Sequence, residues 1–196
     1  MKRNSALASI LCAALLLPTL GHAATVDISG VKLEDRTTVA GQPLVLNGAG
    51  VRYKAVFKVY TAGLYLGQKA ETTEAVLAAT GPRRMTITML RDIDSAELGK
   101  LFSRGMEDNM DRAAFSKLIP GVLRMSQIFS EHKKLKEGET FLIDWIPGTG
   151  TVISVKGKPQ GEPIKDVEFY NAMLRIWLGA KPADWKLKDE LLGKAA

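Results

Sequence analysis

The chain has 196 residues, of which 46% are hydrophobic and 24% are charged, and its formal net charge is +6. These fractions are ordinary for a folded domain, so collagen-like, fibrous and intrinsically disordered classes are excluded. The mild positive charge favours anionic partners, but it is too small to indicate nucleic acid.

The first residues have the order of a secretory signal peptide. Lys2 and Arg3 form a positive start, residues 6–17 are almost entirely apolar, and small residues stand at 21 and 23. We therefore expect a signal peptide over residues 1–23, a single domain over residues 24–196, and a periplasmic or secreted location. The apolar run is short for a bilayer span, so no transmembrane segment is predicted. Cys12, the sole cysteine, falls in the leader, which excludes disulfides and thiolate metal sites from the mature domain.

The first half of the mature chain reads mainly as strands. Alternating or β-branched residues predict strands at 25–28, 44–46, 52–66 and 84–90, with a turn at Asn47-Gly48 and a helix over 71–79. The segment 52–66 is predicted as one long strand.

The second half is mainly helical. Asp94-Ser95 predicts a helix start, because their side-chain oxygens can accept the first unpaired amide hydrogens. This helix is predicted to end at about 111, and a second one covers 112–129. A hairpin of 141–146 with 151–155 follows, and then helices at 167–178 and 182–192. Grouped strands and grouped helices predict an α+β fold, with helices on one face of a mainly antiparallel sheet.

Several kinds of catalytic site are disfavoured by the residues present. His132 is the only histidine of the mature domain and stands among charges, so a serine–histidine–acid triad and a histidine zinc site are not predicted. Gly48-Ala49-Gly50 lacks the rest of a dinucleotide fingerprint, and no phosphate loop is present. We predict neither metal nor cofactor.

The paired charges of the sequence have structural interpretations. Asp92 and Asp94 lie at a strand-to-helix junction, where capping is the better interpretation. Arg83-Arg84 and Lys133-Lys134 have no interleaved aromatic residues for stacking on bases, and we expect them to be solvated. Nucleic acid is therefore not an expected partner.

One group of residues suggests a small-ligand site. Arg52 and Tyr60 share one face of the predicted strand, where a guanidinium and a phenol could hold an oxyanion together. On the helix after Asp94, Phe102, Met106 and Asn109 share a face, which would form the opposite wall of a cleft. A structural interpretation stays open, with Arg52 as a surface charge or half of an ion pair and the helix row as plain core.

Several short segments, taken in order, resemble the chalcone isomerase family. They are Gly48-Ala49-Gly50-Val51-Arg52, the segment 60–66, the helix 101–109, the late hairpin and the helix end 174–179. The resemblance covers nearly the whole mature chain, and secreted bacterial chalcone isomerase-like proteins look most similar. It implies an open-faced β-sandwich, in which a large antiparallel sheet carries a layer of helices.

The resemblance also implies roles for individual residues. Arg52 matches an arginine that is essential in the plant enzyme, and Asn109 matches an asparagine that contacts its substrate. Tyr60, Phe102 and Ile176 stand where the plant site has a threonine, a tyrosine and a serine or threonine. Family members that bind fatty acids without isomerase activity keep an arginine and a tyrosine for the carboxylate.

Three hypotheses follow for the function. The first is an exported binder of a lipophilic, fatty-acid-like anion, held by Arg52, Tyr60 and Asn109 and lined by Phe102, Met106, Ile176 and Trp177. The second is an intramolecular lyase or isomerase acting on a chalcone-like enone, with Arg52 as the catalytic oxyanion stabiliser. The third is a structural or interaction domain that has no ligand.

Overall fold

A seven-stranded antiparallel sheet forms the centre of the protein, which is described here over residues 24–194 of a computed structural model. The predicted signal peptide lies outside the described residues. The strand order is β11 (Lys158–Pro159), β10 (Gly150–Val155), β9 (Thr140–Ile146), β6 (Arg83–Met89), β5 (Phe57–Leu66), β4 (Gln42–Lys54) and β3 (Arg36–Val39). The predicted α+β class with a large antiparallel sheet is therefore confirmed.

Aspartates begin four of the five helices that the described residues form. These helices are α1 (Thr73–Ala78), α2 (Ser95–Glu107), α3 (Arg112–Ser130), α4 (Val167–Leu178) and α5 (Trp185–Leu191). Asp94, Asp111, Asp166 and Asp184 each accept a backbone hydrogen bond at the start of α2, α3, α4 and α5. None of these helices has both the length and the hydropathy that a bilayer crossing requires.

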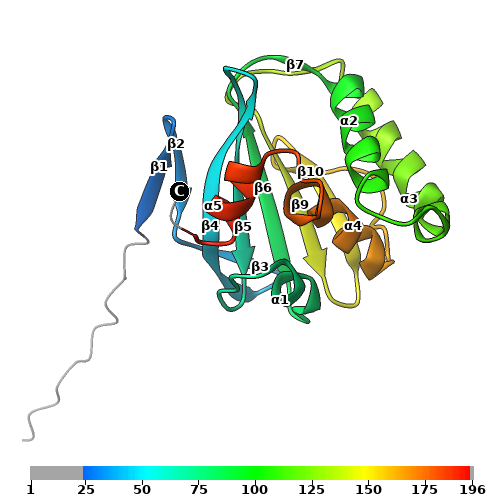
Figure 1. The fold of residues 1–196 in the computed structure, drawn as a ribbon, viewed down its shortest axis with the longest axis horizontal. Helices are drawn as coiled ribbons and strands as arrows, with labels where there is room; N and C mark the ends of the chain where they lie inside the picture. Colours follow the sequence, from blue (N-terminus) through cyan, green and yellow to red (C-terminus); the bar gives the residue numbers. More distant parts are fainter. Residues whose placement is uncertain (1–23, 195–196) are drawn as a thin grey trace, which may run out of the picture.

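The main core lies between the sheet and the helices, two of which, α4 and α5, stand in front of the strands in Figure 1. Alternate residues of β5 and β6 point to this side, which is why the sequence alternates there. The buried residues of this face include Tyr60, Ala62, Leu64, Leu66, Met85, Ile87 and Met89. They pack with Phe102, Phe129 and Trp177 from three helices, so the helix layer and the sheet share one core.

A separate hairpin lies against part of the sheet's other face. It consists of β1 (Thr25–Ile28) and β2 (Val31–Glu34), drawn in dark blue at the side of the sheet in Figure 1. Leu33 packs close to Gly63, where a side chain on the glycine would come within 3.1 Å of it. The Tyr65 hydroxyl donates to the Glu34 carbonyl oxygen at 2.9 Å, which fixes the hairpin to β5. A further two-stranded sheet joins β7 (Ile93–Asp94) and β8 (Lys134–Leu135).

The prediction of one long strand over 52–66 was wrong, because this segment is the end of β4, a tight turn and β5. Lys54 pairs with Phe57, so Ala55 and Val56 form the turn. Ala55 adopts a φ of 54°, a region that glycine enters far more easily, and no glycine, proline or asparagine marked the turn. The predicted turn at Asn47-Gly48 was also wrong, because both residues lie within β4 at a shift in its pairing with β5.

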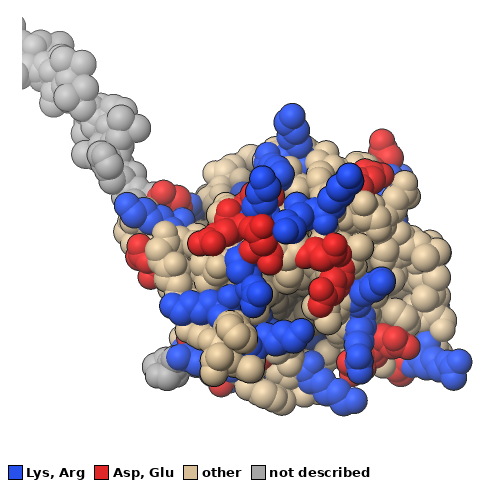
Figure 2. Space-filling view, turned by 90° about the horizontal axis from the view of Figure 1, so that it is seen from above, with Lys and Arg blue, Asp and Glu red and all other residues tan. Residues whose placement is uncertain are grey.

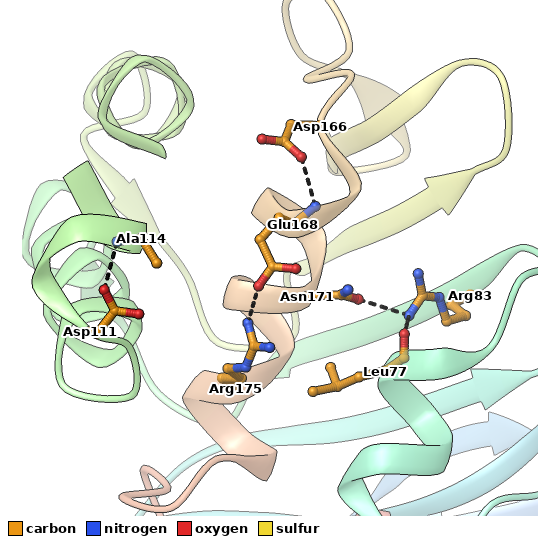
Figure 3. A network of polar contacts seen from close by, with 8 residues as sticks. All are labelled: Leu77, Arg83, Asp111, Ala114, Asp166, Glu168, Asn171 and Arg175. Carbon is orange, nitrogen blue, oxygen red and sulfur yellow. Dashed lines mark hydrogen bonds and ion pairs between the residues drawn. The ribbon is translucent and has the colours of Figure 1, made fainter. Parts of the chain in front are cut away.

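The prediction that Arg83 and Arg84 are solvated was wrong as well. Arg83 is 1% exposed, and its Nη1 donates to the carbonyl oxygens of Val76 and Leu77 and to Oδ1 of Asn171. Figure 3 shows the bonds to Leu77 and Asn171. Its guanidinium also stacks on Tyr170, with Cζ 4.8 Å from the ring centroid. Arg83 therefore fixes α1 and α4 to the sheet. Arg84 makes a bidentate ion pair with Asp144 across β6 and β9, with both N···O distances at 2.7 Å.

Candidate functional site

A pocket of about 460 Å³ opens between the β4–β5 hairpin, the length of α2 and the segment 181–183 that precedes α5. Its volume lies within the range of about 300–1,000 Å³ that is usual for small-ligand sites. Its walls are made by Arg52, Lys54, Phe57, Val59, Tyr60, Arg91, Asp92, Ile93, Asp94, Glu97, Leu98, Leu101, Phe102, Arg104, Gly105, Asp108, Ile176, Lys181, Pro182 and Ala183. Four of the six residues predicted from the sequence are among them, namely Arg52, Tyr60, Phe102 and Ile176.

Arg52 and Tyr60 are direct cross-strand partners in the ladder of β4 and β5. Partners in register project to the same face of a sheet, with Cβ atoms about 5 Å apart. The two side chains are thus neighbours on the helix-facing side, and both border the pocket. The sequence placed them on one face of a single strand, whereas the hairpin brings them side by side.

The hydroxyl of Tyr60 accepts a hydrogen bond from the indole nitrogen of Trp177, at 2.9 Å. Both residues are buried, with 4% and 0% of their surface exposed. Because the indole can only donate, the hydrogen of the phenol stays available for an acceptor in the pocket. Burial raises the pKa of Tyr60 to about 12, so this group is a neutral donor at ordinary pH. Trp177 was predicted to line the cleft, but it does not border the pocket and instead contacts Tyr60, which does.

Arg52 is partly neutralised by Asp184, the residue that begins α5. The distance from its Nη1 to the Asp184 Oδ2 is 3.7 Å, and 22% of the arginine side chain remains exposed. The same Oδ2 accepts the backbone hydrogen of Tyr53, at 3.0 Å. The other carboxylate oxygen caps α5 by accepting from the amides of Lys186 and Leu187. Asp184 is therefore held firmly, and its long ion pair leaves N–H groups of the guanidinium for a second anion.

Two glycines explain how α5 comes so close to Arg52. A Cβ atom on Gly48 would lie 2.0 Å from the carbonyl oxygen of Glu190, and one on Gly50 would lie 1.7 Å from Glu190 Oε2. At Gly48 the blocking atoms belong to the backbone of α5, so the helix packs on β4 here because this side chain is missing. At Gly50 the space is filled by the end of the Glu190 side chain. The Gly48-Ala49-Gly50 segment is therefore the part of β4 on which α5 packs.

The inner wall of the pocket is apolar. Phe102 and Ile176 are 2% and 3% exposed, and the Phe102 ring meets the Trp177 ring edge to face at 5.3 Å. Leu98 and Val59 add to this wall, and neither was predicted to do so. The helical spacing of Leu98 and the position of Val59 in a strand are the sequence features from which these two residues could have been predicted. Met106 lies on the same helix but is fully buried and does not line the pocket.

Asn109 also lies off the pocket wall, although its neighbour Asp108 belongs to that wall. Its amide nitrogen donates to the carbonyl oxygens of Gly105 and Lys181, at 2.8 and 2.9 Å. Its Oδ1 accepts the backbone hydrogen of Lys181, at 2.7 Å. Every polar atom of this side chain thus has a protein partner. Asn109 fixes the end of α2 to the segment 181–183, and both of these parts contribute residues to the pocket wall.

Charged side chains stand around the mouth of the pocket. The basic ones are Arg52, Lys54, Arg91, Arg104 and Lys181, and the acidic ones are Asp92, Asp94, Glu97 and Asp108. Figure 2 views the end of the molecule where β7 and the β4–β5 turn lie, and there charges of both signs surround a recess. Within residues 24–194, no three potential metal ligands are gathered. The site therefore offers an apolar interior beneath a charged rim.

Comparison with known proteins places this geometry in a family. No curated protein matches the sequence. Among solved structures, a fatty-acid binding protein of Arabidopsis thaliana is similar, with 14% identity and a TM-score of 0.67 over 86% of this chain and 96% of that one. This likeness supports the fold. Residues 25–193 match the sequence pattern described as chalcone isomerase-like. The chain therefore belongs to the chalcone isomerase-like family.

Proposed function

We propose that the protein binds a lipophilic anion, such as a fatty-acid carboxylate, in the pocket between the β4–β5 hairpin and α2. The observation that carries this proposal is the pairing of Arg52 with Tyr60 at the edge of an apolar cavity. Arg52 supplies charge, and Tyr60 supplies a hydrogen that Trp177 leaves free. Phe102 and Ile176 provide the surface against which a hydrocarbon chain would pack.

The comparison with known structures supports the same chemistry. The similar Arabidopsis protein is described as a fatty-acid binding protein, and it shares this fold at low sequence identity. The proposal carries that type of ligand over to this chain because the residues of its own pocket suit it. Phe102 and Ile176, which offer no hydroxyl, favour binding over chemistry at this site.

We also propose that the protein acts outside the cytoplasm, in the periplasm of a bacterium or as a secreted protein. The support is the order of charged, apolar and small residues in the first 23 positions. Mass spectrometry of the protein recovered from the cell envelope or medium tests this, because cleavage gives an N-terminus at Ala24. Recovery of the intact chain from the cytoplasm would contradict it.

The ligand proposal is tested by extraction and titration. Lipids carried through purification are extracted with organic solvent and identified, and lauric and palmitic acids are titrated into the wild type and Arg52→Ala. Removing a charged hydrogen-bond donor costs about 1.5–3 kcal/mol, so we expect roughly tenfold to hundredfold weaker binding. Arg36→Ala is the matched control, because Arg36 is exposed on β3 and does not border the pocket. Equal affinities of wild type and Arg52→Ala would remove the assignment.

An isomerase remains the competing function, since the same guanidinium would stabilise an enolate oxygen. Incubation with a 2′-hydroxychalcone at neutral pH distinguishes the two. We expect closure at the background rate and a racemic flavanone. A stereoselective product that depends on Arg52 would replace the binding proposal with a catalytic one.

A further inference from the structure

We infer that the tip of the β4–β5 hairpin docks on an anionic lipid bilayer and brings the mouth of the pocket to the membrane surface. The tip is defined here as residues 54–58, which comprise the tight turn and the residues that flank it. The inference that a ligand enters the pocket from the bilayer rests on the proposed function, whereas the docking itself rests on the surface of the tip.

The end of the tip is apolar and strongly exposed. Val56 is 82% exposed, the largest fraction among the exposed large hydrophobic side chains of residues 24–194, and Phe57 is 59% exposed. They project from a two-residue turn whose first residue, Ala55, has a φ of 54°. A turn this tight holds the two side chains at the extremity of the hairpin. Such a shape suits insertion among lipid headgroups.

Basic side chains surround this apolar end. Lys54 and Lys58 flank the turn and are exposed, and the guanidinium of Arg91 lies over the Phe57 ring at 5.5 Å. The nearby carboxylate of Asp92 is paired with Lys134 at 3.5 Å. Apolar and aromatic groups with adjacent lysines and arginines are the combination that binds the interface of anionic membranes.

The tip is continuous with the proposed ligand site. Lys54, Phe57 and Arg91 belong both to the tip or its basic surround and to the wall of the pocket. Leu101 of α2, also on that wall, is 44% exposed. A lipid leaving the bilayer beside Phe57 would therefore meet apolar surface along the way to Arg52 and Tyr60.

The size of the tip favours a bilayer over a protein partner. Stable protein interfaces bury about 800 Å² on each partner, which far exceeds the area of two protruding side chains. A bilayer needs no complementary groove, and its anionic headgroups complement Lys54, Lys58 and Arg91.

The test places an environment-sensitive fluorophore on the tip of the full chain. Val56→Cys is labelled in a Cys12→Ser background, which removes the one native cysteine. Leu123→Cys on α3 is the matched control, because Leu123 is 65% exposed and is not part of the pocket at Arg52. Both proteins are mixed with vesicles of equal parts phosphatidylglycerol and phosphatidylcholine, and with vesicles of phosphatidylcholine alone.

We expect a blue shift and a severalfold rise in emission at position 56 with the anionic vesicles, weakened by added salt and absent at position 123. No change at position 56, the same change at both positions, or an equal response to the neutral vesicles would overturn the docking. Self-association of the protein without a vesicle response would assign the tip to a second copy and overturn it too.

A second measurement separates this inference from the proposed function. Val56 does not line the pocket, so Val56→Ser should bind a fluorescent fatty acid in solution with wild-type affinity. Transfer of that fatty acid from anionic vesicles to the protein should slow severalfold. Wild-type transfer by this variant would overturn loading through the tip. If the wild-type protein binds no fatty acid in solution, the proposed function is wrong. The fluorophore at position 56 still shows in that case whether the tip docks on anionic vesicles.

Discussion

The indole nitrogen of Trp177 donates to the hydroxyl oxygen of Tyr60 across 117 residues of sequence, at 2.9 Å in the buried interior. This bond orients the phenol and leaves its hydrogen for the pocket, where Arg52 is the neighbouring side chain. The polar end of the pocket is therefore supported from within the core.

Trp177→Phe should weaken both the fold and ligand binding. The change removes the indole donor and creates a small cavity, and we expect a loss of about 2–3 kcal/mol in the free energy of unfolding. Urea denaturation followed by fatty-acid titration measures both effects. Trp185→Phe is the control, because Trp185 is 63% exposed and its replacement should change stability by less than about 0.5 kcal/mol. Wild-type affinity in Trp177→Phe would show that the bond does not orient Tyr60 for the ligand.

Asp184→Asn should strengthen anion binding. Asparagine keeps an oxygen for the cap of α5 but loses the acceptor of the Tyr53 amide and the negative charge 3.7 Å from Arg52. That charge would repel an incoming carboxylate. We expect a gain of about 1 kcal/mol, or roughly fivefold in affinity, by isothermal titration calorimetry. Asp189→Asn on the same helix faces Lys194 and should leave the affinity unchanged. Weaker binding in Asp184→Asn would mean that the aspartate positions Arg52 for the ligand.

The affinity for a fatty-acid anion should be constant between about pH 7 and pH 9. Burial raises the pKa of Tyr60 from 10.0 to about 12, so the phenol remains a hydrogen-bond donor throughout this range. The raised pKa also adds to the free energy of unfolding. This contribution is complete below pH 10 and is lost as the pH rises through about 12. Titrations at several pH values, repeated with Tyr60→Phe, measure the effect. A decline before pH 9 that is absent from Tyr60→Phe would indicate early ionisation.

Gly48→Ala should be strongly destabilising. Its Cβ would lie 2.0 Å from the backbone oxygen of Glu190, so α5 would have to move away from β4, at a cost above about 3 kcal/mol. Gly67→Ala provides the comparison, because a Cβ there meets no atom within 4 Å. Thermal unfolding of the two variants measures the difference. Similar melting temperatures would contradict the close packing of α5 on β4.

Asn109→Ala should lower stability more than it lowers affinity. The side chain makes three hydrogen bonds to the backbone of Gly105 and Lys181, and their loss should cost about 2 kcal/mol. Because Asn109 does not line the pocket, we expect less than a fivefold change in fatty-acid affinity. Gln127→Ala, which removes an exposed amide on α3, should change neither quantity. A large loss of affinity at unchanged stability would restore the direct ligand contact that the family resemblance implies for Asn109.

The fold class could be predicted because capping residues, turn residues and alternating apolar residues recur along the chain and indicate most of its helices and strands. Asp94 caps α2 as predicted, and the turn Pro147-Gly148-Thr149 joins β9 to β10 in the predicted hairpin. The turn at Ala55-Val56 contains no typical turn residue. Pairing of β4 with β5 holds Ala55 in a backbone conformation that alanine rarely adopts. The hairpin was consequently predicted as one strand.

Only part of the site could be read from the sequence. Arg52 and Tyr60 share a face in either topology, since alternation places them there on one strand and cross-strand pairing places them there on two. Asp184 was missed, because the last helix was predicted to begin at Pro182 and the aspartate reads as interior to it. Its contact with Arg52 joins distant segments, which periodicity within either segment cannot reveal.

The packing of α5 on the glycines of β4 also makes the pocket depend on the C-terminal end of the fold. Tyr53 and its acceptor Asp184 are separated by 131 residues, so this contact joins two distant parts of the chain. Local opening of α5 would remove both the internal counter-ion of Arg52 and the wall formed by residues 181–183. The charge balance and the shape of the pocket would therefore change together whenever this helix detached.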